Sequence, residues 1–163
     1  DDVSEYFAFD DWPKQESVIE MGGRQLIIIP TPGHQEDAIS IYDTQTKWLL
    51  TGDTFYPGYV YVKNWDNYRK SINRLAVFTS DYNVSALLGA HIEMKNEAGK
   101  YYEIGSTYQP DESPLPLMAN DLLKLNNALM SADKPQKLAL NSIIVEPLGA
   151  FPKLIGKVVG WFM

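Results

Sequence analysis

Three short apolar runs in this chain each lead to a glycine and then to a histidine or an aspartate. The runs end before Gly33-His34, before Gly52-Asp53 and before Gly89-Ala90-His91. Short apolar segments bounded by Pro or Gly favour buried strands. In α/β folds, residues just beyond the carboxyl ends of strands gather at one edge of the sheet. We therefore expect His34, Asp53 and His91, which include both histidines of the chain, to lie close together.

Imidazole and carboxylate groups are suitable ligands for zinc, iron or manganese. A single histidine or aspartate after a strand is more often a hydrogen-bonding loop residue, a turn residue or a helix cap. The joint pattern of His34, Asp53 and His91 at three strand ends favours metal binding. The sequence thus predicts a metal site formed by these three residues.

The rest of the chain reads as alternating strands and helices, which places it in the α/β class. An amphipathic helix is predicted over 65–79, with Asn64 as its N-cap, because apolar residues recur there at spacings of three and four. A second helix is predicted over 118–129, an aromatic loop over 55–62 and a long loop over 92–114. Strands are expected at 17–20, 25–29, 38–42, 47–51, 84–88 and, as one or two short strands, 137–145.

Composition limits the classes of function. At 163 residues the chain is expected to form a single domain, 1–163. A net charge of −7 argues against nucleic-acid binding, and the absence of cysteine excludes a thiolate nucleophile and Cys-based metal sites. No apolar run reaches the roughly 20 residues of a membrane span, and residues 1–11 show no signal peptide. We expect a soluble protein, either cytoplasmic or mature periplasmic.

The three segments resemble motifs of the metallo-β-lactamase superfamily. Thr31-Pro32-Gly33-His34 is similar to its TPGH motif, Gly52-Asp53 to its GD motif and Gly89-Ala90-His91 to its last GH motif. The resemblance implies an αββα sandwich. It also implies that His34 binds the first metal, Asp53 bridges both and His91 binds the second. The cofactor implied is two Zn²⁺ ions, or another divalent metal, and the reaction is attack of metal-bound hydroxide on an ester, thioester or lactam-like bond of a small molecule.

One motif of that superfamily is missing. The signature HxHxDH, which carries further ligands, is absent, because no histidine precedes His34. The chain therefore resembles the C-terminal half of the sandwich, no catalytic residue is identifiable in it, and we expect it to be inactive alone. The missing N-terminal half would come from the same parent chain, from a second chain or be replaced by self-association. The alternatives are a non-catalytic partner-binding module that keeps the half-fold, or an inert fragment.

Several other residues have two interpretations. Asp37 could accept the second ring N–H of His34 or simply cap its loop. Tyr56 and Tyr59 could contact substrate or pack in the core. Residues 151–163 have the pattern of an amphipathic terminal helix, which we expect to pack on its own core; the alternatives are a membrane surface or a partner groove.

Overall fold

The larger of two sheets carries all three motif segments. The computed structural model describes residues 3–103 and 105–149, and within these ranges the larger sheet has the order β1-β2-β3-β4-β6-β7. β4 and β6 run parallel, and every other neighbouring pair in this sheet is antiparallel. Its strands are β1 (Ser17–Glu20), β2 (Gln25–Pro30), β3 (Ile39–Asp43), β4 (Trp48–Gly52), β6 (Ala86–Gly89) and β7 (Pro116–Leu117).

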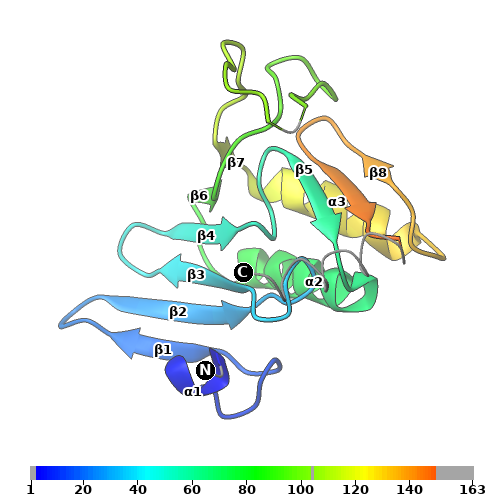
Figure 1. Ribbon diagram of the computed structural model, residues 1–163. Coiled ribbons are helices and arrows are strands. Elements are labelled where there is room, and N and C mark those ends of the chain that lie inside the picture. Colours follow the sequence, from blue (N-terminus) through cyan, green and yellow to red (C-terminus); the bar gives the residue numbers. More distant parts are fainter. Residues whose placement is uncertain (1–2, 104, 150–163) are drawn as a thin grey trace, which may run out of the picture.

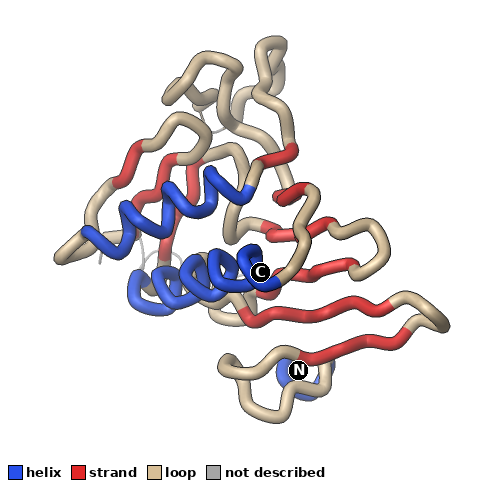
Figure 2. Tube along the Cα trace, turned by 180° about the vertical axis from the view of Figure 1, so that it is seen from behind, coloured by secondary structure: helices blue, strands red, loops and turns tan. Residues whose placement is uncertain are grey.

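A smaller sheet lies beside the larger one, and the helices cover one side of both. β5 (Tyr59–Val62) pairs in parallel with β9 (Ile144–Pro147), which pairs antiparallel with β8 (Leu138–Ala139). Helices α2 (Trp65–Asp81) and α3 (Ala119–Ser131) pack together behind the strands in Figure 1 and in front of them in Figure 2. The short helix α1 (Val3–Tyr6) lies near β1. The mixed α/β class is as expected.

Helix α2 confirms the helix predicted from the apolar spacing and places its start at Trp65. The Asn64 side-chain oxygen accepts a hydrogen bond from the Asn67 backbone N–H at 3.1 Å, so one N–H of the first turn is satisfied. The apolar face of α2, which includes Tyr68, Ile72 and Leu75, is buried against the sheet. The core is therefore a single layer of sheet against a layer of helices.

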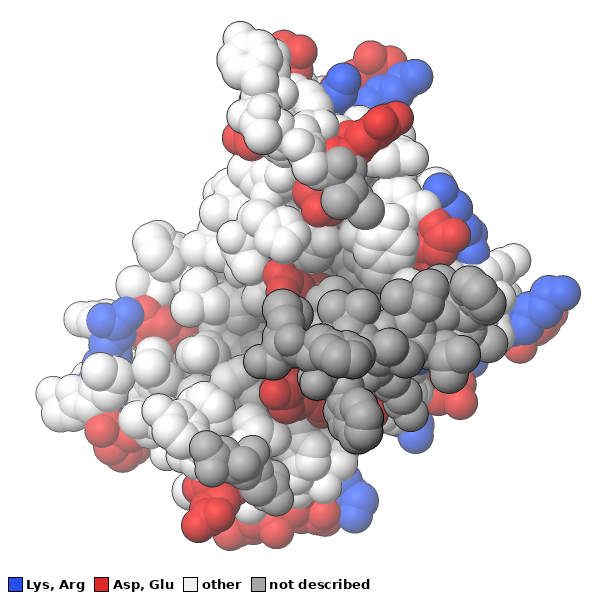
Figure 3. Space-filling view, in the orientation of Figure 1, with Lys and Arg blue, Asp and Glu red and all other residues white. Residues whose placement is uncertain are grey.

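The larger sheet is apolar on both faces, and its two faces differ in exposure. On the helix side, paired residues of five neighbouring strands are all buried: Ile27, Tyr42, Leu49, Leu87 and Leu117. On the opposite side, Ile28 pairs with Ile41, Ile41 with Leu50, and Leu50 with Leu88. Here Leu50 is 39% exposed and Trp48 46% exposed. The basic side chains visible on this side of the molecule lie around its margin (Figure 3).

The predicted aromatic loop is partly wrong. Residues 59–62 form strand β5, because each pairs with a residue of β9, from Tyr59 with Ile144 to Val62 with Pro147. The predicted strands are confirmed with ends that differ by one or two residues, and the segment 137–145 forms β8 and the start of β9. The predicted terminal helix at 151–163 lies outside the described residues. Within the described ranges, no helix has the length and apolar character needed to cross a membrane.

Candidate metal centre

The loop that carries His34 is held against helix α2. Gly33 has a φ of 143°, and a Cβ built there would lie 2.5 Å from the Tyr68 Cα and 2.5 Å from its N. Ser71 on the same helix donates a hydrogen bond to the Pro32 carbonyl at 2.7 Å. A side chain at position 33 has neither a favourable backbone conformation nor space, so the turn before His34 requires glycine.

Buried hydrogen bonds join the loop that carries Asp53 to the loop that carries His34. The buried hydroxyl of Thr54 lies 3.3 Å from the Thr31 hydroxyl and 3.3 Å from the Thr31 carbonyl. Tyr68 donates a hydrogen bond from its hydroxyl to the Thr54 carbonyl at 2.9 Å. Thr31 of the first motif and Thr54, which follows Asp53, therefore meet in the interior, and this contact joins the His34 loop to the Asp53 loop.

The third loop is fixed to the second. The Ala90 N–H donates to the Gly52 carbonyl at 3.1 Å. A Cβ built at Gly89 would lie 2.1 Å from the Tyr56 Cβ. The backbone at Gly89 therefore packs directly against Tyr56, and a larger residue would not fit there. The ring of His91 then meets the Tyr56 ring edge-on, with centroids 4.3 Å apart. The backbone thus carries His91 towards Asp53.

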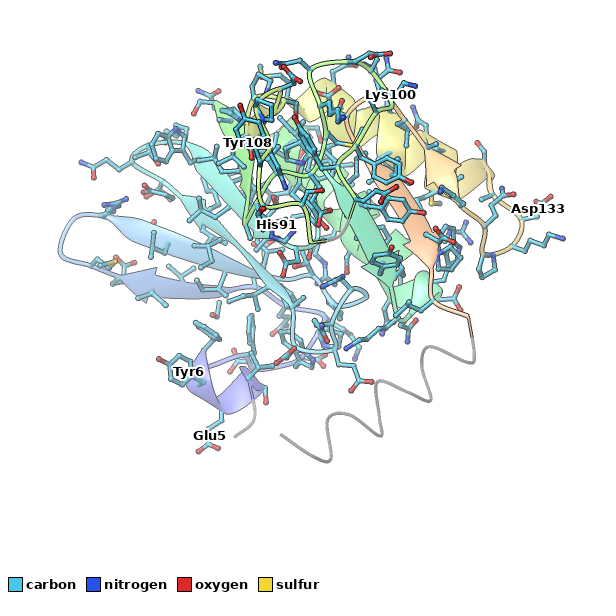
Figure 4. All side chains as sticks on the ribbon, turned by 45° about the horizontal axis from the view of Figure 1, so that its top comes forward. Glu5, Tyr6, His91, Lys100, Tyr108 and Asp133 are labelled. Atoms are coloured by element: carbon cyan, nitrogen blue, oxygen red, sulfur yellow. The ribbon has the colours of Figure 1, made fainter. Side chains whose placement is uncertain are left out.

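The structure brings the three predicted residues together around one carboxylate. His34 Nε2 lies 4.0 Å from Asp53 Oδ2, and His91 Nδ1 lies 3.6 Å from Asp53 Oδ1. Each histidine therefore faces a different oxygen of Asp53. Figure 4 shows His91 between the two sheets, far from Glu5 and Asp133.

One oxygen of Asp53 lacks a hydrogen bond. Oδ1 is buried and has no hydrogen-bond partner within the described part of the chain, although the Asp53 side chain as a whole is 45% exposed. An unpaired buried carboxylate oxygen is costly unless a cation or a donor meets it. As the side chains stand, however, residues 3–103 and 105–149 contain no group of three or more His, Asp or Glu that could hold a metal ion. The two histidines flank the Asp53 carboxylate, and the three side chains do not converge on a single point.

The protonation of His34 is set by the backbone. Its Nδ1 lies 2.8 Å from the Tyr61 carbonyl oxygen, which can only accept. Nδ1 therefore carries the proton, and in the neutral ring Nε2 presents its lone pair towards Asp53. The Tyr61 carbonyl therefore occupies the acceptor position that one of the two interpretations gave to Asp37. Asp37 is exposed, and a role for it stays a prediction.

Sequence reasoning missed Glu93, a fourth ionisable residue at the site. Its Oε2 accepts hydrogen bonds from the Tyr59 N–H at 2.7 Å and from the Tyr56 hydroxyl at 3.2 Å. Its Oε1 lies 3.8 Å from His91 Nε2. The signal in the sequence is the spacing His91-Ile92-Glu93, which puts a carboxylate two residues from a predicted ligand.

The two tyrosines proposed to contact substrate have different positions. Tyr56 is buried, and its single hydroxyl hydrogen is shared between two acceptors, the Tyr59 carbonyl at 2.9 Å and Glu93 Oε2 at 3.2 Å. Its ring packs against the His91 ring. Burial, followed by the nearby Glu93 carboxylate, raises the pKa of Tyr56, so its phenol stays a donor. Tyr59 is bonded through its hydroxyl to Glu146 and Lys137, and burial raises its pKa. Substrate contact by either tyrosine stays a prediction.

The comparison with protein families agrees with these motifs. Residues 4–125 match the model of the metallo-beta-lactamase superfamily. The chain belongs to this superfamily. Its members usually bind metal ions, and the superfamily is one of hydrolases.

Related proteins are longer than this chain. Acyl-coenzyme A thioesterase MBLAC2 of Gallus gallus is 30% identical over 99 residues, which cover 58% of this chain and 35% of the thioesterase. A solved archaeal superfamily protein from Sulfolobus tokodaii is 14% identical, with a TM-score of 0.46, over 87% of this chain and 45% of its own. A metallo-beta-lactamase from Pontibacter korlensis is 15% identical, with a TM-score of 0.44, over 73% and 47% respectively. The chain thus spans about a third of the curated relative.

Proposed function

We propose that this chain supplies part of a dinuclear metal site in a hydrolase, with His34, Asp53 and His91 as ligands. The observation that carries the proposal is that the two histidines face different oxygens of the Asp53 carboxylate. That arrangement suits a carboxylate that bridges two ions, each bound also by one histidine. The unpaired Oδ1 of Asp53 and the lone pair of His34 Nε2 support it.

The proposal also accounts for the absence of a three-residue metal group in the described ranges. Each ion would receive one imidazole and one carboxylate oxygen from this chain, whereas zinc sites use about four ligands, or three and a water. Further ligands would come from a segment or chain outside this one. We therefore expect weak metal binding and negligible hydrolysis by this chain alone.

For the complete protein, the proposed metal is zinc and the proposed substrate class is an acyl thioester. A zinc ion lowers the pKa of bound water from 15.7 towards about 7 and so supplies hydroxide at neutral pH. The substrate class is taken from the printed activity of the thioesterase relative. Esters and lactams are the comparison substrates, since one scaffold of this kind hosts several chemistries.

Zinc competition tests the metal site. We expect the wild-type chain to bind zinc with micromolar or weaker affinity against a chromophoric chelator, and Asp53→Asn to bind at least about tenfold more weakly. Asp10→Asn, at an exposed position, is the control for loss of one negative charge and should match wild type. Equal affinity in Asp53→Asn and wild type would contradict the site and favour a non-catalytic module. Nanomolar affinity in a monomeric sample would mean that further ligands lie within the chain.

The sheet face away from the helices has its own proposed role. We propose that the face formed by Ile41, Trp48, Leu50 and Leu88 packs against the remaining part of the sandwich, supplied by the parent protein or by a second chain. Two observations support this occupant: the face is apolar across three neighbouring strands, and the thioesterase relative extends well beyond the matched region. Self-association across the same face is the alternative outcome.

A further inference from the structure

A groove lies between helices α2 and α3, on the side of the helix layer that faces away from the sheets (Figure 2). Its volume is about 370 Å³, and it is lined by Asp66, Arg69, Lys70 and Asn73 of α2 and by Met130 of α3. The four residues of α2 follow one another at spacings of three, one and three, so they share one stripe of that helix. The groove therefore combines two cationic side chains, one carboxylate, one amide and one apolar side chain.

Arg69 differs from the other arginines of the chain in its contacts. Of the three arginines, Arg24 pairs with Asp43, and Arg74 donates to two backbone carbonyls. Arg69 has no hydrogen bond or ion pair within residues 3–103 and 105–149, and its Nε is buried without an acceptor there. A guanidinium has five N–H donors, and a buried donor without an acceptor is costly. Arg69 therefore has unused capacity to bind an anion.

The carboxylate in the groove does not satisfy this capacity. Asp66 precedes Arg69 by three residues and Lys70 by four, yet it forms an ion pair with neither of them in the described part of the chain. Asp66 lies in the first turn of α2, where the unpaired N–H groups of the helix N-terminus favour a negative charge. The charges of Arg69 and Lys70 are thus left without a nearby partner, in a chain whose net charge is −7.

We propose that the α2–α3 groove binds a small organic anion through a phosphate or carboxylate group, with Arg69 as the main contact. The planar guanidinium matches two oxygens of either group, and Lys70 adds a second positive charge. The Asn73 oxygen lies 3.5 Å from Asn126 Nδ2, which leaves the NH₂ group of Asn73 to donate. A volume of about 370 Å³ exceeds that of a bare oxyanion, so the ligand has an organic part, which meets Met130.

This site is separate from the proposed metal centre. Its lining residues include none of His34, Asp53 and His91. The groove also lies on the opposite side of the larger sheet from the face with Trp48 and Leu50, because the helices cover the other side of that sheet. It therefore stays open when that face is covered, and its test needs no metal ion.

Calorimetric titration of the whole chain tests the binding. Phenyl phosphate and benzoate carry the same ring with different anionic groups, and benzyl alcohol is the uncharged probe. We expect at least one anion to bind with a Kd of about 1 mM or lower, and the tighter of the two identifies the group. Absence of binding by both anions, or equal binding of benzyl alcohol, would overturn the proposal.

Amide NMR of the same samples locates the ligand. We expect shifts in residues 66–73 of α2 and 126–130 of α3, which contain the lining residues. Shifts confined to other segments would overturn the assignment to the groove.

Two charge variants test Arg69. We expect Arg69→Gln to bind the anion at least about tenfold more weakly, because hydrogen bonds to a charged partner are lost. Lys124→Gln is the matched control, since it also removes a positive charge from the helix layer and its exposed side chain does not line the groove. It should bind within about twofold of wild type, because exposed charges are screened. Equal affinity in the two variants would overturn the role of Arg69.

A second pair of variants covers a loss of folding in Arg69→Gln. Met130→Glu places a carboxylate in the groove, where it competes with the ligand for Arg69, and we expect binding at least about tenfold weaker. Leu123→Glu is its control, because both residues are exposed on α3, by 55% and 44%, and Leu123 does not line the groove. Wild-type affinity in Met130→Glu would overturn the proposed site.

Discussion

Gly33 lies in direct contact with the backbone of Tyr68, so the turn before His34 can form only if position 33 has no side chain. A Cβ at Gly33 would come within 2.5 Å of the Tyr68 Cα and N, both in the first turns of α2. Backbone atoms of a helix cannot move aside as the end of a side chain can. The site is thus built on close packing between a loop and a helix.

Gly33→Ala is expected to destabilise the chain by at least about 2–3 kcal/mol, since it combines an unfavourable φ with a clash against helix backbone. Chemical denaturation measures the free energy of unfolding, and the His34 imidazole signals report displacement of the ring. Gly99→Ala is the matched control, because Gly99 also has a positive φ, of 73°, with nothing within 4 Å of a built Cβ. It should cost only about 1–2 kcal/mol. Equal losses of unfolding free energy in the two variants would show that the contact with Tyr68 does not affect stability.

Leu49 and Leu50 are neighbours in β4 with opposite environments. Leu49 is fully buried among the helices, and Leu50 is 39% exposed on the other face. Leu49→Ala should cost about 2–5 kcal/mol because it leaves a cavity in the core. Leu50→Ala should cost less than about 1 kcal/mol, since much of its side chain already meets water. Urea unfolding of the two variants under the same conditions checks this, and similar losses would mean that both faces are covered in the isolated chain.

The ion pair of Asp43 with Arg24 predicts a pH dependence of stability. Arg24 donates to Asp43 Oδ1 at 2.9 Å and also to Oδ2, and Gln45 N–H and the Thr46 hydroxyl donate as well. These hydrogen bonds hold the pKa of Asp43 well below its usual range, and the hydrogen bond from Arg24 makes the largest contribution. A carboxyl whose pKa is depressed on folding stabilises the fold above its unfolded pKa of about 3.9. That contribution is lost as the pH falls below this value.

Thermal melts of wild type and Asp43→Asn between pH 7 and pH 3 test this. Wild type should melt at the higher temperature at pH 7 and pH 5, and the difference should shrink below about pH 4. Asp10→Asn, at an exposed position, should show no such trend. A difference that stays constant down to pH 3 would mean that Asp43 stabilises the turn through shape and not through charge.

Local patterns in the sequence predicted most of the larger sheet, helix α2 with its Asn64 cap, and the meeting of His34, Asp53 and His91. The strands and the helix depend on residues that are near one another in the chain. The meeting of the three site residues follows from the rule that residues beyond the carboxyl ends of strands gather at one edge of the sheet. The strand at 59–62 was not predicted, because it is completed by parallel pairing with β9, far along the chain. Its aromatic residues alone did not distinguish a strand from a loop.

The supporting contacts of the site could not be predicted for the same reason. The acceptor for His34 is the carbonyl of Tyr61, and a carbonyl carries no signature in the residue type. Glu93 is held by Tyr56 and by the Tyr59 N–H, which become neighbours once β5 is in place. The candidate ligands followed from the sequence, whereas the groups that contact them depend on how the sheets pack.

The outer face of the larger sheet gives the last prediction. Trp48 and Leu50 expose apolar surface there next to Ile41 and Leu88, and contiguous apolar patches on a stable protein usually mark an association site. Leu50→Lys should cost the isolated chain little, because the long side chain can reach water from a site already 39% exposed. In the assembled protein the same lysine would be buried without a partner, which costs several kcal/mol.

Sedimentation and unfolding measurements separate these states. We expect wild type to associate, either with the remaining part of the fold or with itself, and Leu50→Lys to sediment as a monomer. Val77→Lys is the control, since Val77 is an apolar residue of α2 that is 52% exposed on the helix side, and it should associate like wild type. If the dilute wild-type chain sediments as a compact monomer that melts cooperatively, and Leu50→Lys behaves identically in the longer parent protein, then the chain covers its own core and this face has no partner.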